Sequence, residues 1–89
     1  GSASLELIET GRLPDLFNER ITASIACVRT VTLADRGTAV ITARRNLADP
    51  ASALIWRVAP GKGVQSEEAL GDPFVALELE RLRAEYDVR

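Results

Sequence analysis

The chain has 89 residues and a formal net charge of −2, which bounds it to one small domain with a modest core. It contains no histidine and one cysteine, Cys27. These counts exclude an intrachain disulfide, serine–histidine or cysteine–histidine catalysis, and zinc or haem sites of the usual kind.

We therefore expect a single domain over residues 1–89 that has no enzymatic activity and no cofactor. Residues 1–2 are interpreted as left over from cloning. The chain shows no signal-peptide pattern, and its longest uncharged run, residues 21–28, is too short to span a bilayer. The sequence thus predicts a cytoplasmic protein without a membrane partner.

The charge is unevenly distributed along the chain. Residues 1–28 hold two basic and four acidic side chains, whereas residues 29–66 hold six basic and two acidic ones. Residues 67–89 hold three basic and seven acidic side chains. A basic middle is therefore flanked by two acidic ends.

The N-terminal part of the chain favours helix. Residues 4–10 are either one or two helical turns or a loosely docked arm. Residues 14–28 predict a longer helix, because Pro14 suits the first helical position and the apolar residues recur at three- and four-residue steps. This stripe, which we expect to cover one face of a sheet, consists of Leu13, Leu16, Phe17, Ile21, Ile25 and Val28.

Residues 38–58 predict a β-hairpin. The first run alternates Ala39, Ile41 and Ala43 with more polar neighbours, and its β-branched residues favour a strand. A turn around Pro50 follows, and Pro60 is expected to stop the second run after residue 58. If Trp56 shares the face of its alternating neighbours in that run, it belongs to the core.

Residues 29–36 leave two alternatives open. Val31 and Leu33 alternate with threonines, which is a strand pattern, but the segment could also be a loop. The first alternative, with a turn at residues 35–37, gives three antiparallel strands and the second gives two. The predicted fold class is α+β: a small two- or three-stranded antiparallel sheet packed by an N-terminal and a C-terminal helix.

The last third of the chain predicts a helix that is preceded by a short capped turn. Residues 60–63 form a glycine-rich turn without the spacing of a nucleotide-binding loop. A short helical turn at residues 66–71 precedes Asp72, a suitable N-cap, and a helix over residues 73–86. This helix carries a seam at heptad-like spacing: Val75, Leu79, Leu82 and Tyr86. The seam packs either inside its own domain or against a second copy or a partner's groove.

The hairpin also carries candidate contacts for phosphates or an acidic partner: Arg44, Arg45, Arg57 and Lys62. Arg44 and Arg45 are adjacent on a strand and so point to opposite faces; only one of them can join Arg57. These side chains could equally pair with the acidic C-terminal helix or be solvated. The pairs Glu67/Glu68 and Glu78/Glu80 are interpreted as surface carboxylates.

One family resemblance involves the run Leu13-Pro-Asp-Leu-Phe-Asn-Glu, the segment Ile41-Thr42-Ala43 and the segment Val58-Ala59-Pro60. Over residues 5–64 the chain resembles small phage-encoded proteins called "replication terminator protein". The resemblance implies a phage or mobile-element origin and a role linked to DNA, without implying contact residues. Residues 72–89 have no counterpart in it.

Together, these features favour a small non-enzymatic accessory protein that binds a host macromolecule. The preferred partner is a protein, such as a defence or replication factor that would be inhibited. The alternative is a nucleic-acid-binding module that uses the arginine-rich hairpin. We also predict a two-fold homodimer through the seam at residues 75–86, split by Leu79→Glu or Leu82→Glu and insensitive to salt.

Overall fold

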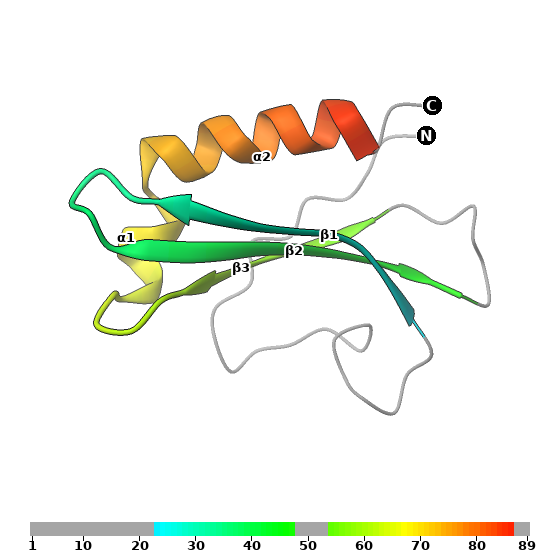
Figure 1. Ribbon diagram of the computed structural model, residues 1–89, viewed down its shortest axis with the longest axis horizontal. Helices are drawn as coiled ribbons and strands as arrows, with labels where there is room; N and C mark the ends of the chain where they lie inside the picture. Colours follow the sequence, from blue (N-terminus) through cyan, green and yellow to red (C-terminus); the bar gives the residue numbers. More distant parts are fainter. Residues whose placement is uncertain (1–22, 48–53, 87–89) are drawn as a thin grey trace.

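The structure is a computed structural model, and the residues that it describes are 23–47 and 54–86 (Figure 1). Three strands come first and two helices follow: β1 (Ala23–Thr32), β2 (Thr38–Asn46), β3 (Ile55–Pro60), α1 (Ser66–Leu70) and α2 (Pro73–Tyr86). The strands form one antiparallel sheet in the order β1-β2-β3. The predicted α+β class is confirmed, and so is the third strand that the sequence left open.

Strand β1 corrects the prediction of a helix over residues 14–28. Residues 23–28 are extended and pair with β2, and residues 14–22 lie outside the described part of the chain. Ile25 and Val28 are three residues apart, as on a helix, yet they pair with Arg44 and Thr42, which share one face of β2. A β-bulge between Ile25 and Cys27 inserts one extra residue and so gives a strand the three-residue spacing that was interpreted as helical.

The connection between β1 and β2 is a tight turn over residues 33–37, in agreement with the predicted turn at residues 35–37. The Arg36 N–H donates to the Leu33 carbonyl at 3.0 Å, and the Leu33 N–H donates to the Gly37 carbonyl at 2.7 Å. Arg36 has a φ of 77°, in the left-handed region that few residues other than glycine adopt. The Asp35 carboxylate accepts a bond from the Gly37 N–H at 3.0 Å, which helps to hold this turn.

Strand β3 extends two residues further than predicted. Proline was expected to end the strand before residue 60, but Pro60 pairs with Ala39 at its end. Because β3 is an edge strand, a missing N–H is tolerated there. The Gly61 N–H then donates to the Thr38 carbonyl at 2.7 Å, and a Cβ on Gly61 would collide with the Thr38 hydroxyl. Because the residue after β3 passes so close to the start of β2, position 61 requires glycine.

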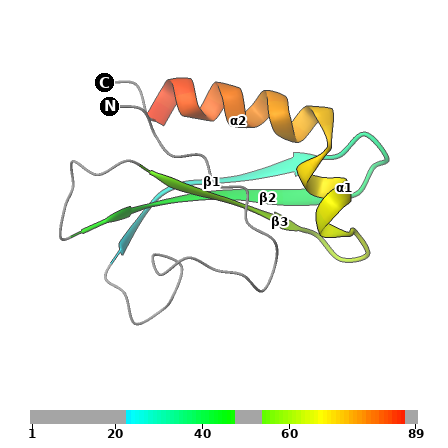
Figure 2. The same cartoon turned by 180° about the vertical axis from the view of Figure 1, so that it is seen from behind.

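Both helices lie where the sequence placed them, and α2 has the predicted bounds. Figures 1 and 2 show α2 running alongside β1, with α1 at the end of the sheet, where it packs on β3. The Asp72 carboxylate caps α2 by accepting bonds from the N–H groups of Phe74 at 2.8 Å and Val75 at 3.3 Å. Its second oxygen accepts a bond from the Ala34 N–H at 2.8 Å. One buried carboxylate thus connects the start of α2 to the β1–β2 turn.

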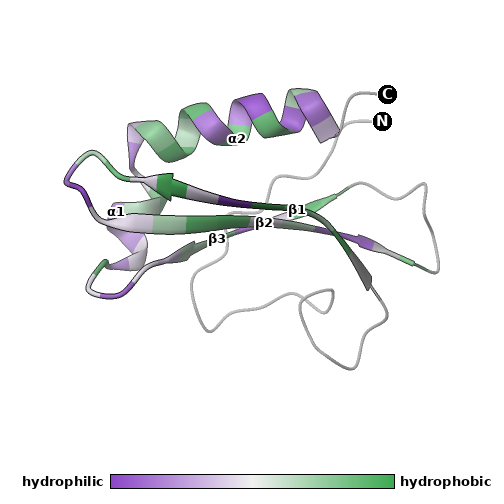
Figure 3. Ribbon diagram, viewed as in Figure 1, coloured by the Kyte–Doolittle hydropathy of each residue, from purple (hydrophilic) through white to green (hydrophobic). Residues whose placement is uncertain are grey.

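The core lies between the sheet and the two helices (Figure 3). Trp56, with 0 % of its surface exposed, confirms the prediction that it faces inward with Leu54 and Val58. It pairs with Ala43, which in turn pairs with Cys27, so that small side chains flank the large ring. The helices contribute four buried side chains: Ala69, Val75, Leu79 and Leu82. Predictions for residues 4–10 and for the centre of the hairpin turn lie outside the described residues.

Candidate protein-binding face

Within residues 23–47 and 54–86, the sheet has a second face that neither α1 nor α2 covers, and we call it the open face. Its members follow from the register, because directly paired residues of an antiparallel sheet point to the same side. The rows across the strands are Ile25–Arg44–Ile55, Val28–Thr42–Arg57, Thr30–Val40–Ala59 and the pair Thr32–Thr38. The face therefore combines β-branched apolar side chains, threonines and two arginines.

On this face, most of the exposed side chains belong to β1. Ile25 and Val28 are each 58 % exposed, whereas Cys27 and Val31 on the opposite face of the same strand are 4 % and 7 % exposed. Thr30 and Thr32 are exposed as well, and the open-face residues of β3 are half-buried. The open face thus presents an exposed strip of apolar side chains and threonines along β1, beside the half-buried Arg44 and Arg57.

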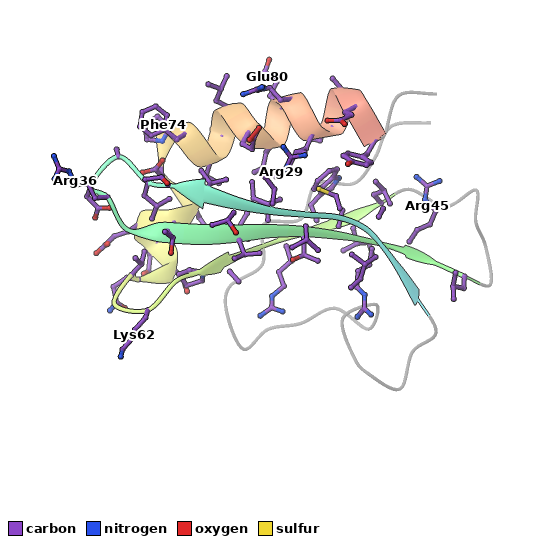
Figure 4. All side chains as sticks on the ribbon, viewed as in Figure 1. Arg29, Arg36, Arg45, Lys62, Phe74 and Glu80 are labelled. Carbon is purple, nitrogen blue, oxygen red and sulfur yellow. The ribbon has the colours of Figure 1, made fainter. Side chains whose placement is uncertain are left out.

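The four basic candidates are only partly brought together. Arg44 and Arg57 are diagonal neighbours on the open face, because Arg44 pairs with Ile55 and Arg57 with Thr42. Arg45 lies on the side that carries α2, as the adjacency argument predicted for one of the two arginines (Figure 4). Lys62 lies at the other end of the sheet from Arg45, the end that also carries Arg36 on a separate turn (Figure 4). The arginine that joins Arg57 on one face is therefore Arg44.

Most of the predicted self-association seam lies in the core of the single chain. Val75, Leu79 and Leu82 are 0 %, 4 % and 1 % exposed and belong to the core of the single chain. Tyr86, at 36 %, remains partly exposed. The structure thus corresponds to the alternative in which the seam packs inside its own domain, because the sheet needs these side chains to cover β1.

The charges of the described residues separate between the two layers. The sheet and its turns, residues 23–47 and 54–63, carry six basic side chains and one acidic one. Residues 64–86, which form the helical layer, carry six acidic and two basic ones. Within the described residues, the sheet layer is therefore basic and the helical layer acidic.

Two titratable groups are perturbed by their surroundings. Burial raises the pKa of the Cys27 thiol, with the nearby Arg29 guanidinium acting in the opposite direction. The pKa of Asp72 is lowered, chiefly by the hydrogen bond from the Ala34 N–H, although burial opposes the shift. Asp72 is 8 % exposed and both of its oxygens accept backbone bonds, so it acts as a structural carboxylate.

Other features of the described residues give no sign of a second site. Within residues 23–47 and 54–86, no group of three histidine, cysteine or carboxylate side chains is arranged to hold a metal ion. No helix in this part of the chain is long and apolar enough to cross a membrane. Of the four surface carboxylates, Glu67, Glu68 and Glu80 are exposed, while the Glu78 side chain is 18 % exposed and lies 3.7 Å from Arg81.

Sequence reasoning missed the strip along β1 because it assigned Ile25 and Val28 to a buried helical stripe. The signal that could have revealed it is the density of β-branched residues in residues 25–32, which favours a strand. Comparisons with protein-family models, with curated proteins and with solved structures gave no match to this chain. The resemblance to phage-encoded replication terminator proteins therefore stays a prediction.

Proposed function

We propose that this protein is a small non-enzymatic accessory protein that binds another protein through the open face of its sheet. The observation that carries the proposal is the exposure of Ile25 and Val28, each 58 %, beside the diagonal pair Arg44 and Arg57. The buried core of a protein interface is more apolar than the rest of the surface, and arginine is enriched at interfaces. Burying the exposed part of each aliphatic side chain would contribute about 1–2 kcal/mol.

The composition of the open face favours a protein over a nucleic acid. Sequence-tolerant binding of single strands depends on aromatic platforms, and the one tryptophan lies on the covered face with 0 % exposure. No aromatic side chain belongs to the open-face rows that the register defines. The net charge of −2 also disfavours strong nonspecific binding to phosphates.

In biological terms, we propose a phage or mobile-element protein whose cytoplasmic partner is a host protein, with inhibition of a defence or replication factor as its action. The resemblance stated above supports the origin, and the composition of the open face supports a protein partner.

A photo-crosslinking residue at Thr30, in the exposed strip along β1, tests the proposal. The matched control carries the same residue at Glu68, which is exposed on α1. In an extract of the host cells, we expect a defined protein to be captured from position 30 and not from position 68. Capture of the same protein from both positions would show that the open face does not select it.

The captured protein, once purified, allows a quantitative test with two variants. Val28→Asp places a charge in the exposed strip along β1, whereas Ala76→Asp places the same charge at an exposed position of α2. We expect Val28→Asp to weaken binding at least about tenfold, which corresponds to about 1.4 kcal/mol, and Ala76→Asp to leave it unchanged. Equal affinities for the two variants would contradict the proposed face.

A nucleic-acid-binding function is the second candidate, and the observation that favours it is the juxtaposition of Arg44 and Arg57 on one face. It predicts that affinity for oligonucleotides falls steeply as the salt concentration rises, because phosphate contacts release counterions. Fluorescence anisotropy with single- and double-stranded oligonucleotides measures this slope. The absence of binding at about 50 mM salt would eliminate this candidate.

A further inference from the structure

Strand β1 lies at one edge of the sheet, and the register shows which of its backbone groups point outward. Directly opposite residues of an antiparallel pair alternate between pairs that exchange hydrogen bonds and pairs that do not. The bond from the Leu33 N–H to the Gly37 carbonyl fixes this alternation, so the odd-numbered residues of β1 after the bulge bond to β2. The even-numbered residues direct their N–H and C=O groups away from β2, and we call them the edge residues: Val28, Thr30 and Thr32.

Strand β2 shows the same alternation from its other side. Thr38 pairs with Thr32 on β1, yet its carbonyl accepts a hydrogen bond from the Gly61 N–H, just beyond β3, at 2.7 Å. The Thr32–Thr38 pair therefore exchanges no bond, and the backbone groups of Thr32 point to the outside. In the part of the chain that the structure describes, β1 pairs with β2 alone, so the outward groups of the edge residues have no strand beside them.

The side chains along this edge leave it accessible. All three edge residues lie on the open face and are exposed, Val28 by 58 %. Residues 28–32 contain no proline or lysine, which commonly protect an edge strand from pairing. Their one charged side chain, Arg29, pairs with Ile41 and so lies on the side of the sheet that carries α2. On the open face the edge is therefore uncharged and β-branched, which suits packing beside another strand.

The opposite edge of the sheet is less suited to pairing. The same alternation directs outward the backbone groups of Trp56, Val58 and Pro60. Proline has no N–H to donate, and the other two residues are buried. Strand β3 also has six residues against ten in β1, and α1 packs on it. An added strand is therefore favoured on β1.

The geometry of this edge favours one extended segment over a second copy of the chain. Only another extended backbone repeats N–H and C=O groups at the spacing of a strand. Two copies paired through β1 in an antiparallel, two-fold arrangement would carry both α2 helices on the same side of the joined sheet. Helix α2 packs chiefly on β1, and neighbouring strands are about 4.8 Å apart, whereas the axes of packed helices need about 8–10 Å. A single extended segment brings no second helix to this place.

We propose that the partner contributes an extended segment that pairs with β1 as a fourth strand of the sheet. Main-chain hydrogen bonds to the edge residues supply affinity, and alternate side chains of the segment pack beside the edge residues on the open face. We expect β-branched side chains at these alternate positions, because they pack well beside valine and threonine. The inference rests on the proposed function, and it specifies which kind of element the partner supplies and where it binds.

The first measurement is amide hydrogen exchange of the purified chain alone. We expect the amides of the edge residues to exchange at least about tenfold faster than those of Arg29 and Val31, which bond to β2. Equal protection that is independent of protein concentration would mean that another part of the same chain already occupies the edge. Protection that rises with concentration would mean that a second copy does. Either of these two results would overturn the proposal.

The second measurement compares the affinities of Thr30→Pro and Thr30→Ala for the captured protein. Both variants lose the threonine side chain, but only proline removes the outward N–H, and no bond to β2 is lost with it. We expect Thr30→Pro to bind at least about tenfold more weakly than Thr30→Ala, because a carbonyl of the partner loses its donor. Circular dichroism verifies folding. Should Thr30→Pro misfold, Thr32→Pro and Thr32→Ala repeat the comparison at the end of the strand.

The outcomes separate this inference from the proposed function. If Val28→Asp weakens binding while Thr30→Pro and Thr30→Ala bind equally, the partner contacts the open face without adding a strand, and the inference alone fails. If Val28→Asp also binds normally, the open face is not the binding surface, and the proposed function fails as well. Amide exchange of the complex gives an independent check, because the edge residues should then exchange at least about tenfold more slowly. Unchanged exchange at these residues would contradict the added strand.

Discussion

Replacing two leucines of α2 by alanine, one at a time, distinguishes the buried side of this helix from its exposed side. Leu82 is 1 % exposed and belongs to the core, whereas Leu77, five residues earlier on the same helix, is 52 % exposed. Replacing a buried leucine by alanine costs about 2–5 kcal/mol, because the transfer free energy is lost and a cavity remains. The same change at a half-exposed position should alter the free energy of unfolding by no more than about 0.5 kcal/mol.

The magnitude is large relative to the total stability. A domain of this size has a free energy of unfolding of about 5–15 kcal/mol, and each kcal/mol shifts Tm by about 4–8 °C. Leu82→Ala should therefore lower Tm by at least about 10 °C, while Leu77→Ala should shift it by only a few degrees. Urea unfolding followed by circular dichroism measures both variants.

One result would refute this reasoning. If Leu82→Ala left the free energy of unfolding unchanged and instead reduced the mass in sedimentation, Leu82 would lie between two chains. The seam at residues 75–86 would then form a homodimer interface, as the sequence predicted, and would not belong to the core of a single chain.

Three further predictions follow from the turns and the buried polar groups. Gly61→Ala should destabilise the fold by about 1–3 kcal/mol because its Cβ collides with Thr38, the first residue of β2. Gly63→Ala should destabilise it by about 1 kcal/mol, because the φ of Gly63 is 82° and nothing lies close to its Cβ position. Urea unfolding measures both variants. Asp72→Asn should keep the helix cap but lose the hydrogen bond from the Ala34 N–H, which lowers Tm. Because the pKa of Asp72 is lower in the folded than in the unfolded chain, the stability of the wild type should fall as the pH decreases below about 4. The contribution of Asp72 to this pH dependence should be absent in the variant. Cys27 should react with a thiol reagent much more slowly than the unfolded chain, and equal rates would contradict its burial.

The C-terminal half shows what local sequence patterns can predict. Asp72 followed by proline marks a helix start, and the structure has α2 beginning at residue 73 with Asp72 as its cap. The alternation around Trp56 placed the tryptophan in the core, because each strand has one buried face. In both cases the signal is local, and the tertiary structure agrees with it.

The N-terminal boundary of the sheet could not be predicted in the same way. Ile25 and Val28 have helical spacing, and only pairing with β2 together with the bulge shows that both lie on one face of a strand. The position of the candidate site depends on that register, so it was missed along with the strand. The adjacency of Arg44 and Arg45 did predict that only one of them joins Arg57, but which of the two does so depends on the pairing of β2 with β3.

The central claim is that the open face of the sheet is the surface that binds the partner. The most direct measurement is an NMR titration of the labelled protein with the captured partner at concentrations where the protein alone is a single chain. We expect the largest amide shift changes along residues 25–32 and in the residues of β2 and β3 paired with them, and little change in α1 and α2. Changes confined to the two helices, with the amides of β1 unaffected, would contradict the account.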